Sequence, residues 1–201
     1  MNPEDNQYSI DYLNQIAPQQ KKSGLGNRLF FAIIGGGILL AVIVGFFALS
    51  SGAGGPTEKM QTLAARLITL QSVADKSQKT IKSGTLRSTN SNLAIFLTNA
   101  NRDIVDPLKN NGITIEKIDK KITAAENGDK LTKTLEDARL NAVFDRVYAR
   151  EMGYQLDTVA SLMTEIYDKS NSKSLKEFMV ATDKNLEPIK KQLTDFNAAN
   201  L

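Results

Sequence analysis

A long apolar run near the N-terminus is the strongest pattern in this chain. The run LFFAIIGGGILLAVIVGFFAL, residues 29–49, has no charged side chain. As an α-helix it would be about 31 Å long, which matches a bilayer hydrocarbon core of about 30 Å. A helix of a small soluble domain would instead be polar on its outer face. The pattern therefore predicts a single transmembrane helix over residues 29–50.

The charges on either side of this run predict its orientation. Lys21, Lys22 and Arg28 precede it, whereas the next cation after it is Lys59, beyond the linker SSGAGGP. Segments rich in Lys and Arg stay in the cytoplasm. We therefore expect residues 1–28 to be the cytoplasmic tail of a single-pass protein of the cell membrane. A cleaved signal peptide is the alternative, but its apolar core is usually only about 7–15 residues long, which favours an uncleaved signal anchor.

Small residues form a stripe along the predicted membrane helix. Gly37, Ala41 and Gly45 recur at every fourth position. Such a stripe lets two helix backbones approach closely within a bilayer. The stripe suggests a homodimer formed through this face, although small residues are also common in membrane helices that do not associate.

After the linker, residues 51–56, the apolar residues recur with the period of an α-helix. Residues 57–201 contain no stretch that alternates like a β-strand, and Asn110-Asn111-Gly112 is expected to form a turn. The predicted fold class is therefore all-α, with an N-terminal single transmembrane helix followed by an extracytoplasmic antiparallel four-helix bundle with short connections. The predicted helices cover residues 57–82, 85–106, 115–125 and 130–169, and a last one begins at Ser172 or Ser174.

Several residues are expected to set the ends and bends of these helices. Ser83-Gly84 should end the first helix, and Pro107 should close the second. Ser174 with Glu177 three residues later fits a capping box at the start of the last helix. Pro188 should kink that helix. Its predicted buried stripe consists of Leu175, Phe178, Met179, Thr182, Leu186, Ile189, Leu193 and Phe196.

Composition excludes most kinds of catalytic and metal-binding chemistry. The 201-residue chain has no cysteine and no histidine, and its net charge is +3. Thiol nucleophiles, disulfides and the usual transition-metal ligands are therefore absent. Neither a phosphate-binding glycine loop nor a Gly-x-Ser-x-Gly motif is present. Cations alternate with anions along the chain, so no nucleic-acid partner is expected, and we predict no cofactor and no enzymatic activity.

One polar pair in the predicted third bundle helix is a candidate site. Gln155 falls inside the apolar stripe on a helical wheel, and Glu151 lies at its edge. A buried glutamine without partners would cost roughly 1–3 kcal/mol, so Asn90, Asn101, Thr182 or a water is expected to hydrogen-bond it. The alternatives are a polar plug that fixes helix register, the floor of a ligand pocket, or a carboxylate metal site. The predicted apolar stripe consists of Leu140, Phe144, Tyr148, Val159, Leu162 and Ile166.

The C-terminal part of the chain resembles a known family. FDRVYAREM and LKEFMVATDKNLEPIKKQL are similar to segments of an uncharacterised family of bacterial envelope proteins. The resemblance implies a ferritin-like four-helix bundle. The histidines of that family would fall near Gln155 and Gln192, where this chain has none, so no metal chemistry is carried over. The matching residues are Phe144, Asp145, Tyr148, Leu175, Lys176 and Pro188.

These observations together predict a non-catalytic protein of the cell envelope. We expect it to contact the lipid bilayer and an envelope or surface protein, as an interaction or scaffold module. The alternative is a sensor-like bundle that binds a ligand and signals through the membrane helix to a separate partner.

Overall fold

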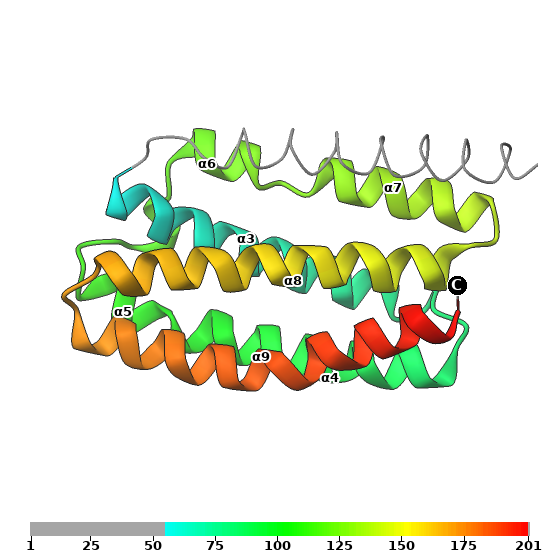
Figure 1. Cartoon of the computed structure of the whole chain (residues 1–201). Helices are drawn as coiled ribbons and strands as arrows, with labels where there is room; N and C mark the ends of the chain where they lie inside the picture. Colours follow the sequence, from blue (N-terminus) through cyan, green and yellow to red (C-terminus); the bar gives the residue numbers. More distant parts are fainter. Residues whose placement is uncertain (1–54, 201) are drawn as a thin grey trace, which may run out of the picture. The chain divides into compact units, whose positions relative to one another are not determined.

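A computed structural model describes residues 55–200, and in this region the chain is helical apart from its connections (Figure 1). The predicted all-α helical bundle is confirmed here. The predicted transmembrane helix, with Gly37, Ala41 and Gly45, lies outside the described residues. Within them, no helix is both long and apolar enough to cross a bilayer. The elements are α3 (Pro56–Ser77), α4 (Gly84–Asp103), α5 (Val105–Lys109), η1 (Ile115–Lys117), α6 (Lys120–Ala125), α7 (Asp129–Leu140), α8 (Phe144–Lys169) and α9 (Lys173–Ala199).

The four longest of these helices pack in a ring. Helix α3 contacts α4 and α8, and α9 contacts the same two helices from the other side. Neighbouring helices run antiparallel. For α3 and α8, Lys59 pairs with Glu165 near one end, and the Asp145 carboxylate accepts from the backbone N–H groups of Lys82 and Ser83 near the other.

The order of these helices requires one long crossover. Because α4 and α8 are both antiparallel to α3, they run in the same direction, and the chain must return along the bundle between them. The segment from α5 to α7 makes this return, so the prediction of short connections throughout is wrong. Its α6 packs on α3 and its α7 on α8, which covers the α3–α8 face, whereas its short α5 packs on α4 and α9 at one end of the opposite face (Figure 1). A bidentate ion pair at 2.7 Å between buried Arg66 and Glu126 holds the crossover to α3.

Apolar side chains from all four long helices fill the ring. The predicted stripe of α9 is confirmed, since its residues from Leu175 to Leu193 are buried and Phe196 packs against the core from a partly buried position. Tyr148, Met152, Leu156 and Val159 of α8 are fully buried at the centre.

Three predicted helix ends differ from the structure. Helix α3 stops at Ser77, and Ser83 caps the next helix instead of ending this one, because its hydroxyl accepts from the Leu86 N–H at 3.3 Å. Helix α4 stops at Asp103, and Pro107 is buried inside the short α5.

The predicted helix over residues 130–169 is two helices. Ala142 has φ 58°, a left-handed conformation that breaks the helical path between α7 and α8. Around it, the Val143 N–H donates to the Ala138 carbonyl at 3.0 Å, and the Ala142 N–H donates to the Arg139 carbonyl at 3.3 Å. These two bonds form a Schellman motif, which ends a helix. Leu140, which was placed in the buried stripe, is 68% exposed at this break.

The same motif follows α5, with glycine in the left-handed position. Gly112 has φ 76°, its N–H donates to the Lys109 carbonyl, and the Ile113 N–H donates to the Leu108 carbonyl, both at 3.0 Å. The turn predicted at Asn110-Asn111-Gly112 is therefore confirmed.

The last helix begins one residue after Ser172, so the predicted capping box at Ser174 and Glu177 is wrong. Ser172 makes no side-chain cap and instead accepts from the Asn111 amide at 3.1 Å, which ties the start of α9 to the turn after α5. Helix α9 continues past Pro188 to Ala199.

Candidate functional site

The buried polar group at the centre of the bundle is Asn90 of α4. Its amide donates to the Ala74 carbonyl at 3.0 Å and to the Gln78 side-chain oxygen, and its own oxygen accepts from the Tyr148 hydroxyl. Asn90 and Tyr148 are fully buried. A buried amide with these partners is a satisfied polar plug and leaves no group free for a ligand.

Asn101 repeats the donor half of this arrangement further along the α3–α4 contact, whereas its own side-chain oxygen has no hydrogen-bond partner among the described residues. Its amide donates to the Leu67 carbonyl at 3.2 Å and to the Gln71 side-chain oxygen at 2.7 Å. In both cases an asparagine of α4 bonds a carbonyl of α3 and the glutamine four residues later. We call these two sets, Asn90 with Gln78 and Asn101 with Gln71, the asparagine–glutamine pairs.

Tyr148 acts in this network as a neutral hydrogen-bond donor. Burial raises the pKa of its hydroxyl well above the usual range, and the nearby Asp75 raises the pKa further. Its ring stacks on Phe144 with the ring centroids 5.8 Å apart. The network therefore stabilises the core and has no group that titrates near neutral pH.

Glu151 and Gln155 do not form the predicted plug. Both are only half-buried, and Glu151 pairs with the adjacent Arg150 at 2.8 Å. Met152 and Leu156 also face the core, which shifts the centre of the buried stripe and leaves Gln155 at its edge. The plug exists, but Asn90 and Tyr148 form it.

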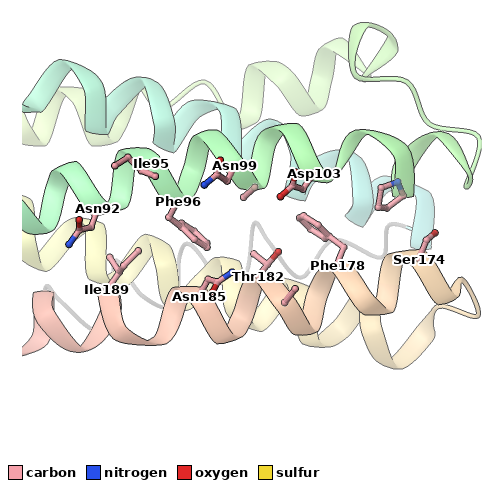
Figure 2. A pocket seen from close by; sticks show the side chains of 13 residues that line it. Asn92, Ile95, Phe96, Asn99, Asp103, Ser174, Phe178, Thr182, Asn185 and Ile189 are labelled. Atoms are coloured by element: carbon pink, nitrogen blue, oxygen red, sulfur yellow. The ribbon is translucent and has the colours of Figure 1, made fainter.

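Thr182, the fifth predicted site residue, lies in a groove between α4 and α9. The groove encloses about 590 Å³, and side chains from the two helices point toward one another across it (Figure 2). Its floor is buried and mainly apolar, whereas its rims are exposed. The floor consists of Phe96, Ala100, Pro107, Phe178, Thr182 and Ile189, and the rims of Asn92, Ile95, Asn99, Asp103, Ala181 and Asn185, with Ser174 half-buried at one end.

The groove is almost free of charge. Residues 88–101, most of helix α4, carry no charged side chain. Among the described residues that line the groove, only Asp103 is charged, and it pairs with the neighbouring Arg102 at 2.8 Å. The rim offers amide groups that both donate and accept hydrogen bonds, beside an apolar floor.

The groove does not provide the parts of a reactive site. Across residues 55–200, no three Asp or Glu side chains lie close enough together to hold a metal ion. The lining supplies only amides, hydroxyls, apolar groups and one paired carboxylate. Such a surface can bind by contact, but it has no activated nucleophile or general base.

Sequence reasoning missed this groove, although two signals pointed to it. One was the uncharged run over residues 88–101, and the other was Ile95, an apolar residue on the polar side of that helix. Ile95 is 62% exposed. Searches against protein-family models, curated proteins and solved structures return no match to this chain.

Proposed function

We propose that this protein is a membrane-anchored, non-catalytic interaction module of the cell envelope, whose helical bundle binds a protein partner through the α4–α9 groove. The observation that carries the proposal is an apolar groove with almost uncharged rims on the α4–α9 face of the ring, opposite the face that α6 and α7 cover. Charged residues recur along the exposed sides of the other helices, so this face differs from them in chemistry as well as in shape.

The shape of the groove favours a protein surface over a small ligand. Small-molecule sites are concave and bury most of the ligand. Here six of the lining residues are exposed along both rims, so a small molecule would stay largely in water. Helix surfaces, by contrast, dock in open apolar grooves by inserting a row of side chains. The sensor alternative would need a closed cavity, and neither Gln155 nor Glu151 lines this groove.

Two further features support the proposal. The apolar run over residues 29–49 would anchor the chain, and the short linker would hold the bundle close to the bilayer, where confinement raises the effective concentration of a partner. The bundle also has a single long crossover, the connection that ferritin-like folds use, so we include a ferritin-like fold in the proposal.

Photo-crosslinking tests this function in the full chain, expressed in membranes. A benzophenone amino acid in place of Asn99 on the groove rim should give discrete protein adducts on irradiation. The matched control places the same group at Ser161, an exposed residue of α8 that does not line the groove. We expect adducts from position 99 and few from position 161. No discrete adduct from position 99, or equal labelling from both, would refute the proposal.

A further inference from the structure

We infer that the occupant of the α4–α9 groove is a second copy of this chain, bound by the same face about a two-fold axis. The inference rests on the proposed function, because it requires the groove to be a protein-binding surface. It identifies the partner by three properties of that surface: its charge, its shape and its size.

Charge is the first property. In a two-fold dimer each surface meets itself, so a charged side chain near the axis lies close to its own copy and is repelled. The neutral run over residues 88–101 avoids this repulsion. A two-fold contact through helix α7, with the sequence DKLTKTLEDARL, would bring like charges together. The amides of Asn92 and Asn99 both donate and accept, so each is complementary to its copy.

The shape of the surface is the second property. Ile95 projects from the rim with 62% of its surface exposed, and the apolar floor with Phe96 and Phe178 lies beside it. A protruding apolar side chain next to an apolar hollow makes one face complementary to itself, because each copy can place its isoleucine in the groove of the other. Two-fold interfaces have this reciprocal form.

Size is the third property. Helix α4 has 20 residues and is therefore about 30 Å long. Two packed helices form a face about 20 Å wide, since helix axes lie about 8–10 Å apart. Such a face covers about 600 Å² per copy, or about 1,200 Å² in the dimer, the lower end for specific interfaces. A dimer of this size is weak in dilute solution and is favoured when both copies share a membrane.

Charged partners fit the surface less well. Phospholipid headgroups, nucleic acids and anionic polymers bind through clusters of Lys and Arg. The α4 cation beside the groove, Arg102, already pairs with Asp103. A neutral helix of another protein is the remaining competitor, and the experiment below separates it from a second copy.

The absence of cysteine makes disulfide trapping specific. We would make Asn92→Cys, Ile95→Cys and Asn99→Cys separately in the full chain, with Ser161→Cys as the control, and treat membranes with a mild oxidant. We expect the groove variants to form disulfide-linked homodimers several-fold faster than the control. Adding Ile95→Lys to Asn99→Cys should reduce that rate at least fivefold, without changing the helical circular dichroism, because Ile95 is exposed.

The outcomes separate the inference from the function. The inference of a second copy is supported if the groove variants form homodimers and Ile95→Lys suppresses their formation. Equal trapping at position 161 indicates random collision and overturns the inference. If no homodimer forms but the benzophenone at position 99 still labels a protein of another mass, the function stands and the second copy is wrong. If neither reagent yields a product, both are wrong.

Discussion

The two Schellman motifs offer a test in which the same backbone conformation should give opposite results. Ala142 and Gly112 occupy equivalent left-handed positions, with φ 58° and 76°. Alanine is strained there because its Cβ approaches the following carbonyl, whereas glycine is not. We therefore expect Ala142→Gly to stabilise the bundle and Gly112→Ala to destabilise it.

The magnitude follows from two opposing terms. The left-handed conformation costs an L-residue about 1–2 kcal/mol. Glycine makes the unfolded chain more flexible, which opposes folding by about 0.4–1 kcal/mol. The net change should be roughly 0.5–1 kcal/mol at each site. A Cβ at Gly112 would meet no other atom within 4 Å, so the backbone conformation alone sets its cost.

Urea unfolding of the full chain in detergent micelles, followed by far-ultraviolet circular dichroism, measures both changes. Ala142→Gly should raise the free energy of unfolding and Gly112→Ala should lower it, without altering the slope against urea. Because the motifs lie in separate connections, the double variant should return close to the parent value. A loss of stability in Ala142→Gly, or no change in Gly112→Ala, would refute the reasoning.

Three other substitutions test the contacts that hold the bundle together. Asp145→Ala should lower the free energy of unfolding by about 1–3 kcal/mol, because the Asp145 carboxylate accepts two backbone N–H groups of the α3–α4 connection. The control, Asp168→Ala at an exposed position, should leave the free energy of unfolding nearly unchanged. Equal effects of the two substitutions would contradict this reasoning. Gly128→Ala should lower the free energy of unfolding by about 2–3 kcal/mol, since φ is 76° and the new Cβ would lie 2.6 Å from a methyl group of α3. An unchanged free energy of unfolding in the urea titration would contradict this and show that α3 shifts to make room. Burial raises the pKa of Tyr148, so above pH 10 the unfolded chain loses this proton first, and stability should fall by about 1.4 kcal/mol per pH unit. Below pH 10 both the folded and the unfolded chain keep the proton, so Tyr148 gives no pH dependence of stability there. Urea unfolding at each pH measures the effect. Tyr148→Phe should abolish the loss of stability above pH 10 that Tyr148 causes, whereas Tyr167→Phe, at an exposed position, should not.

The helices were predictable from sequence because their apolar residues recur with a period near 3.6. The stripe of α9 needed no further information, since one face of that helix is apolar from Leu175 to Leu193. The break before α8 was not predictable in this way. Glycine marks a left-handed turn at position 112, but Ala142 is a strong helix former and gives no such signal.

The candidate site was predictable only in part. A polar plug was expected, and Asn90 and Asn101 were among its candidate members, yet the prediction centred it on Gln155. The error came from leaving Met152 and Leu156 out of the stripe, because these fully buried residues move its centre away from Gln155. The groove depends on which face the crossover covers, and that follows from the direction of each helix in the ring. Helical periodicity carries no information about those directions.

The asparagine–glutamine pairs have a consequence for how α3 and α4 find their alignment. The two asparagines are spaced further apart along α4 than the two glutamines are along α3. Both asparagine–glutamine pairs therefore form together in the observed alignment, and a shifted alignment that keeps one pair can lose the other. A slide that brought Gln71 opposite Asn90 would bring Ala64 opposite Asn101, and the Asn101 amide would lose its glutamine partner, at a cost of about 0.5–1.5 kcal/mol. Apolar stripes alone tolerate a shift by two helical turns. The asparagine–glutamine pairs therefore favour the observed alignment of α3 and α4 over this shifted one.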